Sequence, residues 1–222
     1  MIGFLEIHDR LLAAHGPQHW WPASERFEVI VGAVLVQRTT WRNAELAIDA
    51  LRRQALLSPL ALAGVDGKEL ERCIRSAGFF RIKAERLRLI ARFLAESGGL
   101  DALASLSTDR LREILLGLKG IGEETADTIL LYAFDRPVVI VDEYLRRLTH
   151  RLDSSPSPSL IGDAVLRRLV LDEIRDSGRL NELHALVVEQ GKRRCTRNPH
   201  CAACALRACC GFGRARSDAE FG

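Results

Sequence analysis

The stretch at residues 118–126 reads Leu-Lys-Gly-Ile-Gly-Glu-Glu-Thr-Ala, with two glycines one residue apart directly before an apolar-periodic segment. Glycine permits a positive φ and lets a partner approach the backbone closely. The amides that open a helix form a site for an anion such as a phosphate. An ordinary turn between two helices has a similar composition, so this stretch alone leaves both interpretations open.

An acidic pair follows the glycine turn by about twenty residues. The apolar run Pro-Val-Val-Ile-Val at 137–141 leads to Asp142 and Glu143, and basic residues follow at Arg146, Arg147 and Arg151. An aspartate before a helix is commonly an N-cap. Its place after the glycine turn makes Asp142 a candidate functional carboxylate as well, and one residue can serve both purposes.

Helical periodicity dominates the rest of the chain. Apolar residues recur at helical spacing, and no sustained alternation is flanked by turn residues. The sequence therefore predicts an all-α fold, with a Pro/Ser-rich stretch at 153–158 as a boundary or connection. The expected helices lie at about 3–14, 24–37, 41–53, 68–76, 81–97, 108–117, 122–134, 142–152, 161–176 and 180–191.

Composition indicates an ordinary globular protein. The 222 residues are 47% hydrophobic and 27% charged, and a net charge of +3 is too small to indicate a nucleic-acid partner on its own. Positive charge is nevertheless local, because residues 192–216 hold seven basic residues and no acidic one. The longest apolar run, 29–36, is too short to cross a membrane and the start lacks a signal-peptide pattern, so we expect a soluble, cytoplasmic protein.

Five of the six cysteines lie between Cys195 and Cys210. In a reducing compartment, such clustering indicates a bound metal rather than disulfides. Cys201 and Cys204 form a CxxC pair, flanked by Cys195 on one side and by Cys209 and Cys210 on the other. A four-cysteine zinc site is one interpretation, but a single CxxC between lone cysteines favours a [4Fe-4S] cluster. The spacing leaves Cys209 and Cys210 both open as the fourth ligand.

Taken in this order, the glycine turn, Asp142 and the cysteine loop resemble the endonuclease III family of helix-hairpin-helix DNA glycosylases of the iron-sulfur type. The resemblance covers roughly residues 20–210 and includes the segments 31–39 and 78–84. It implies a monomeric base-excision-repair enzyme, nucleoid-associated in a bacterial or archaeal cytoplasm, that acts on double-stranded DNA containing a damaged base.

The resemblance also implies a two-lobed architecture. Residues 24–141 would form a six-helix barrel domain that contains the helix-hairpin-helix motif. Residues 1–23 and 142–222 would form the cluster domain, whose [4Fe-4S] ligands would be Cys195, Cys201, Cys204 and Cys210, with Cys209 as the alternative to Cys210.

Roles for individual residues follow from the same resemblance. Enzymes that excise a base extrude it from the duplex. Gln37 would fill the gap that the base leaves, Phe79 or Phe80 would wedge the opposite strand, and the amides of Gly120 and Gly122 would hold the phosphate backbone. Asp142 would be the catalytic carboxylate, since breaking an N-glycosidic bond builds positive charge on the sugar. Core packing is the competing interpretation of the two phenylalanines.

The sequence departs from the family's bifunctional members at Glu124. Those members carry a lysine at this position of the pattern, and its amine forms the Schiff base needed for strand cleavage. A glutamate cannot form that imine, and neither Lys119 nor Lys192 is an obvious substitute. Glu124 is therefore a candidate active-site residue that predicts largely monofunctional chemistry, with water as the nucleophile.

A second departure is the pair Trp20 and Trp21, followed by Pro22. Together with residues 119–127, these tryptophans look more like the 3-methyladenine DNA glycosylase branch of the family. They would stack on an electron-poor alkylated purine, with Lys192 as a further pocket or phosphate contact. Packing between lobes is the other interpretation of the tryptophans. The alternatives to this function are an oxidised-pyrimidine glycosylase with abasic-site lyase activity and a DNA-damage-binding protein with little catalysis.

Overall fold

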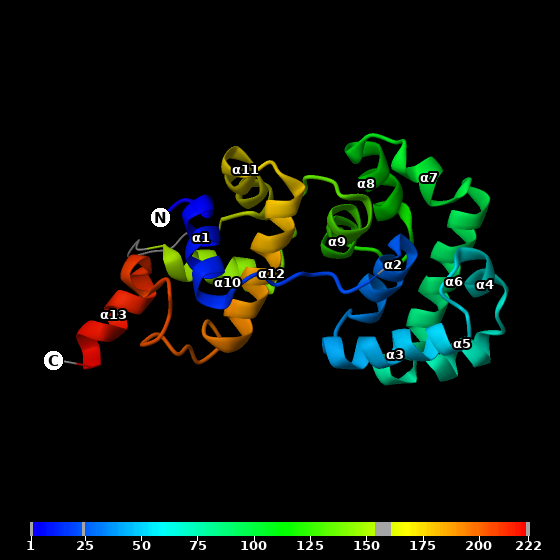
Figure 1. Cartoon of the computed structure of the whole chain (residues 1–222), viewed down its shortest axis with the longest axis horizontal. Helices are drawn as coiled ribbons and strands as arrows, with labels where there is room; N and C mark the ends of the chain where they lie inside the picture. Colours follow the sequence, from blue (N-terminus) through cyan, green and yellow to red (C-terminus); the bar gives the residue numbers. More distant parts are fainter. Residues whose placement is uncertain (1, 24, 154–160, 221–222) are drawn as a thin grey trace. The chain divides into compact units, whose positions relative to one another are not determined.

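The computed structural model describes residues 2–23, 25–153 and 161–220, and this part of the chain contains helices and loops but no strand (Figure 1). The predicted all-α class is confirmed. Within these residues, no helix has the length and apolar character needed to cross a membrane.

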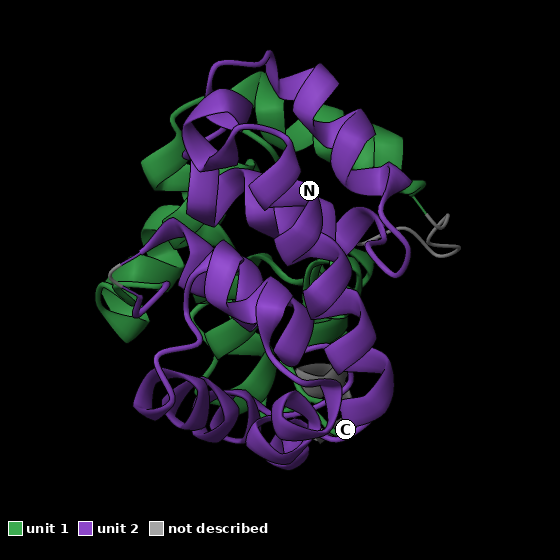
Figure 2. Ribbon diagram, turned by 90° about the vertical axis from the view of Figure 1, so that its right-hand side faces the viewer, with its two compact units in different colours: residues 1–20, 137–222 green, residues 21–136 purple. Residues whose placement is uncertain are grey.

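The chain divides into two compact units, which are coloured separately in Figure 2. One unit consists of residues 21–136, and the other joins residues 1–20 to residues 137–222. The N-terminal helix therefore packs with the C-terminal part of the chain. The second division between the units comes between residues 136 and 137 and not at the Pro/Ser-rich stretch, whose residues 154–158 lie outside the described residues. A six-helix barrel at 24–141 and a cluster domain from 1–23 and 142–222 stay predictions.

The unit formed by residues 21–136 is built around α2 (Arg26–Leu35), whose residues from Phe27 to Leu35 are all buried. Helix α2 packs against α3, α6 and α9. The elements of this unit after α2 are α3 (Trp41–Arg53), α4 (Pro59–Gly64), α5 (Gly67–Cys73), the 3-10 turn η1 (Arg75–Ala77), α6 (Phe80–Glu96), α7 (Gly99–Ala104), α8 (Thr108–Gly117) and α9 (Glu123–Phe134).

The unit formed by residues 1–20 and 137–222 is organised around α12 (Ser177–Arg193), which packs against α1 (Phe4–His15) and α10 (Glu143–Leu152). Its apolar core includes Ile7, Leu11, Leu183 and Leu186. The remaining elements are α11 (Asp163–Glu173), the 3-10 turn η2 (Arg207–Cys209) and α13 (Gly211–Glu220).

Side-chain caps explain why several helices begin where the sequence predicts. Thr40 accepts a hydrogen bond from the amide of Asn43 at the start of α3, and Ser107 accepts one from the amide of Arg110 at the start of α8. Each cap satisfies an amide that has no partner inside the helix. The sequence did not predict α4 and α7, because six-residue helices are too short to show a helical period. The ten-residue helix α13 was also not predicted.

Candidate functional site

The predicted glycine turn forms a tight connection between α8 and α9. Gly120 has a φ of +89° and Gly122 is the N-cap of α9, where it offers no side chain to the first amides of the helix. Arg112 of α8 donates to both carboxylate oxygens of the buried Asp127 of α9, at 2.7 and 3.3 Å. This bidentate pair joins the two helices on either side of the turn and presents the turn as a fixed unit.

Gln37 lies beside this turn, as part of the loop that follows α2. Its side-chain amide donates to the carbonyl of Gly120 at 3.2 Å and to the hydroxyl of Thr125 at 3.0 Å. Arg86 of α6 donates to the other end of the Gln37 side chain. The structure therefore brings the predicted residues Gln37 and Gly120 into direct contact, and it adds Thr125 and Arg86 as partners of Gln37 that the sequence did not indicate.

The two candidate wedge residues, Phe79 and Phe80, differ in their exposure at the start of α6. Phe79 adopts a left-handed conformation with a φ of +47°, and 59% of its surface is exposed. Phe80 is partly buried, and the guanidinium groups of Arg75 and Arg81 lie over its ring. Phe79 is thus the phenylalanine whose ring is available at the surface.

A buried lysine holds the two loops that carry Gln37 and Phe79. The ammonium of Lys83 donates at 2.8 Å to the carbonyls of Leu35, at the end of α2, and of Ala77, at the end of η1. Burial, with a contribution from the charge of Arg86, lowers the pKa of Lys83 to about 8. Burying an ammonium costs free energy unless hydrogen-bond acceptors pair with it. The two carbonyls supply these acceptors, so Lys83 links the two loops.

Asp142 occupies the N-cap of α10, as the sequence predicts. Its Oδ1 accepts a hydrogen bond from the amide of Leu145 at 2.7 Å, and the residue is only 6% exposed. The preceding residues 139–141 are buried and apolar. The Oδ2 atom lies 3.7 Å from Nε2 of His184, a residue of α12 for which the sequence carried no signal.

The two adjacent tryptophans have different surroundings. The Trp20 ring stacks on His184, with centroids 6.3 Å apart and an angle of 16° between the rings, and the ammonium of Lys192 lies 5.4 Å from the Trp20 centroid. Trp21 packs edge-on against Trp41 and Tyr132 within the unit of residues 21–136. Trp20 and Asp142 thus both lie next to His184, with Lys192 over Trp20, whereas Trp21 belongs to a separate aromatic group.

The cysteine loop after α12 forms a small cavity whose wall contains four of the six cysteines, namely Cys195, Cys201, Cys204 and Cys210. Cys209 is not part of this wall, and its thiol donates to the carbonyl of Leu206 at 3.1 Å; the Cys210 thiol donates to the carbonyl of Arg151 at the same distance. Among the described residues, no group of three or more His, Cys, Asp or Glu side chains has the arrangement of a bound metal ion.

N–H donors lie at three of these sulfurs, while burial raises the pKa of the Cys210 thiol. Arg151 donates to Sγ of Cys195 at 3.2 Å, Gln190 donates to Sγ of Cys204 at 3.0 Å, and the amide of Gly213 donates to Sγ of Cys210 at 3.4 Å. Such donors stabilise negative charge on sulfur and set the environment of a cysteine-ligated cluster. The donor set of the loop therefore fits a four-thiolate cofactor.

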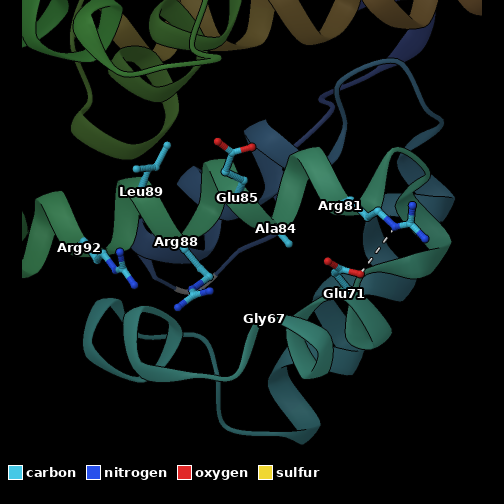
Figure 3. Close-up of a pocket in the computed structure, with 8 residues that line it drawn as sticks. All are labelled: Gly67, Glu71, Arg81, Ala84, Glu85, Arg88, Leu89 and Arg92. Carbon is cyan, nitrogen blue, oxygen red and sulfur yellow. Dashed lines mark ion pairs between the residues drawn. The ribbon is translucent and has the colours of Figure 1, made fainter.

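A cavity of about 220 Å³ between α5 and α6 contains none of the predicted site residues (Figure 3). Its wall carries three arginines, at 81, 88 and 92, and two glutamates, at 71 and 85. Glu71 pairs with Arg81, and Glu85 pairs with Lys119. This wall bears charges of both signs and none of the candidate catalytic residues, so this cavity is not our candidate for the active site.

Residues 31–164 match the family described as HhH-GPD superfamily base excision DNA repair protein. This match spans more than half of the chain and includes Gln37, the glycine turn and Asp142. The chain belongs to this superfamily. It is a base-excision-repair DNA glycosylase of the endonuclease III type.

Relatives of this glycosylase agree with that assignment. A protein of Methanocaldococcus jannaschii named as a DNA repair glycosylase is 37% identical over 217 residues, which cover 92% of this chain and 94% of the relative. Endonuclease III of Thermotoga maritima is 32% identical over 200 residues, which cover 89% of this chain and 88% of the relative.

Solved structures share the fold of the glycosylase. The 3-methyladenine DNA glycosylase of H. pylori, bound to 1,N6-ethenoadenine, is 26% identical with a TM-score of 0.74, over 86% of this chain and 98% of that chain. A trapped covalent intermediate of endonuclease III with DNA has a TM-score of 0.78 at 23% identity, over 98% of this chain and the whole of that chain. The second likeness supports the fold alone.

Gly120 offers a test of the turn of this glycosylase, and Gly117 offers a matched control. A Cβ at residue 120 would combine a positive φ with a collision against the Arg86 side chain, whereas a Cβ at residue 117 would meet open space. We expect Gly120→Ala to lower the free energy of unfolding by about 1–2 kcal/mol, measured by urea denaturation. Gly117→Ala should leave it unchanged or raise it by up to about 1 kcal/mol, since Gly117 ends a helix. Equal destabilisation by both would contradict this account of the turn.

Proposed function

We propose that this glycosylase removes alkylated purines from double-stranded DNA by hydrolysis of the N-glycosidic bond, without cleaving the strand. The observation that carries the proposal is the carboxylate of Asp142, which is nearly buried and fixed at one oxygen by the amide of Leu145. As the base leaves, positive charge builds on the sugar, and a fixed anion stabilises that charge more in the transition state than in the ground state.

Water completes the reaction in this proposal. The bond between the base and C1′ breaks, the base leaves with the bonding electrons, and a water molecule adds to C1′ and loses a proton. Asp142 acts as the electrostatic partner of the sugar or as the acceptor of that proton. No covalent bond to the protein is needed, so the proposal requires no amine near the sugar.

The distribution of lysines supports hydrolysis over strand cleavage. The chain has four lysines, and Glu124 stands at the position that a lysine occupies in bifunctional members. Lys83 is buried against two carbonyls, and Lys119 pairs with Glu85. Lys68 lies in the first turn of α5, and Lys192 lies over Trp20.

Support for an alkylated purine comes from Trp20 and from one relative. The Trp20 ring and the neighbouring Lys192 offer π and cationic groups beside Asp142's partner His184. The H. pylori enzyme, which is named as a 3-methyladenine DNA glycosylase, was solved with an ethenoadenine. The second candidate is excision of oxidised pyrimidines with lyase activity, which the relatives named endonuclease III favour.

For the grip on DNA, we propose that the unit of residues 21–136 supplies the contacts. Phe79 is exposed and is the candidate wedge, Gln37 is the candidate gap-filling residue, and the amides after Gly120 hold a backbone phosphate. Gln37 bonds to Gly120 and Thr125 in this structure. Entry of Gln37 into a duplex therefore requires these two hydrogen bonds to break.

We further propose that Cys195, Cys201, Cys204 and Cys210 hold a [4Fe-4S] cluster. When bound, the cluster would link both ends of the loop through four iron–thiolate bonds. The shared cavity wall of these cysteines and the N–H donors to three of their sulfurs support this set. The cavity wall includes Cys210 and does not include Cys209, which supports Cys210 as the fourth ligand.

A pair of serine substitutions tests the cluster and its fourth ligand. We expect Cys210→Ser to lose most of the bound iron and its visible absorption, because one of four thiolates is missing. The matched control Cys209→Ser should retain both. Iron content and absorption spectra of the purified proteins measure this. One zinc and no iron in the unsubstituted protein would overturn the cluster. Loss of iron from Cys209→Ser but not from Cys210→Ser would make Cys209 the fourth ligand.

A lesion panel tests the proposed reaction. Duplexes that each carry one lesion, either an ethenoadenine or a thymine glycol, are incubated with the enzyme, and the free base is quantified. We expect release of the alkylated purine to be faster by about tenfold or more, which corresponds to about 1.4 kcal/mol in activation free energy. Faster release of thymine glycol would favour the second candidate.

Borohydride trapping on an abasic-site duplex tests the absence of a Schiff base. The unsubstituted enzyme should give no efficient covalent adduct with an abasic-site duplex. The matched variant Glu124→Lys restores an amine and should give one. Efficient capture by the unsubstituted enzyme would contradict the hydrolytic mechanism.

A further inference from the structure

His184 is the side chain of α12 that faces the carboxylate of Asp142. Its Nε2 lies 3.7 Å from Oδ2, and the side chains of His184 and Asp142 are only 13% and 9% exposed. Both residues belong to the same unit, in which α10 packs directly on α12. Their separation is therefore set by the packing of two neighbouring helices.

One hydrogen bond does not fix the plane of the Asp142 carboxylate. Leu145 holds Oδ1, but rotation about the last side-chain bond of an aspartate has a broad, soft energy profile. A second contact, on Oδ2, is needed to select one orientation. At 3.7 Å the contact with His184 is longer than a hydrogen bond, and catalytic hydrogen bonds commonly shorten when the reactant binds.

The imidazole of His184 is itself held in place. Trp20 stacks on it with an angle of 16° between the rings, and a small cavity beside it is lined mainly by apolar residues, including Ile140, Leu183 and Val187. Lys192 lies over the Trp20 ring. Apolar surroundings strengthen a hydrogen bond between a ring N–H and a carboxylate.

We propose that His184 is a positioning residue for Asp142, which donates its Nε2–H to Oδ2 and turns the carboxylate plane toward the sugar. Trp20 then serves this site by orienting the imidazole as well as by offering a surface to the base. The inference rests on the proposed function, because it takes Asp142 as the catalytic carboxylate. It assigns His184 no contact with the base or the sugar.

Two substitutions test separately the contributions of the His184 N–H and of the His184 ring. His184→Phe keeps a ring that stacks on Trp20 but removes Nε2–H. His184→Gln loses the ring but carries an amide nitrogen at a position equivalent to Nε2. The matched control is His150→Phe, the same change at an exposed histidine of α10.

The readouts are the single-turnover rate of base release and the Kd for a duplex that carries an uncleavable abasic-site analogue. We expect His184→Phe to slow release by about 10- to 100-fold, the scale of a misplaced catalytic group. Its Kd should stay within about twofold of the unsubstituted enzyme, a change below about 0.4 kcal/mol. His184→Gln should recover most of the rate, and His150→Phe should match the unsubstituted enzyme.

Full activity of His184→Phe would overturn the inference, and so would a loss of DNA affinity that parallels the loss of rate, since that pattern indicates a structural role. If His184→Phe does not fold, His184→Asn replaces it, because its shorter amide does not reach the Nε2 position. It should then be slow where His184→Gln is fast, and equal rates would overturn the inference. Base release by the unsubstituted enzyme tests the proposed function separately. If the unsubstituted enzyme releases no base, both the proposed function and the role of His184 are wrong.

Discussion

The carboxylate of Asp142 is nearly buried, and a buried carboxylate costs free energy unless hydrogen-bond donors meet its oxygens. The first turn of α10 supplies one donor through the amide of Leu145. The apolar segment 139–141 delivers the residue to that turn, and α12 brings His184 to the remaining oxygen. Packing of α10 on α12 therefore sets the surroundings of this carboxylate. Trp20 stacks on His184, and Lys192 lies over the Trp20 ring.

The unit of residues 21–136 follows a different principle, in which buried polar contacts join loops. Gln37 connects the loop after α2 to the glycine turn, while Lys83 connects that loop to the segment before Phe79. Three segments that are distant in sequence thus become one surface. The bidentate pair of Arg112 and Asp127 fixes the helices on either side of the turn. A surface of this kind suits recognition of a backbone rather than of a base sequence.

The sequence predicted those features that have a local cause. Helices α3 and α8 begin at the predicted residues because Thr40 and Ser107 cap them, and Asp142 caps α10 in the same way. Arg86, Lys83 and His184 left no local signal, because packing brings them to partners more than forty residues away. Spacing left Cys209 and Cys210 equivalent, and the structure places only Cys210 in the wall of the cavity that the other three cysteines line.

The central claim is that the Asp142 carboxylate drives base release while other residues bind the DNA. Its most direct test compares the unsubstituted enzyme with Asp142→Asn, which keeps an oxygen acceptor for the Leu145 amide but removes the charge. The measurement is the amount of free base released from a duplex with one alkylated purine, together with the Kd for that duplex. We expect Asp142→Asn to bind with nearly unchanged affinity and to release no base. Undiminished release by Asp142→Asn would contradict this claim.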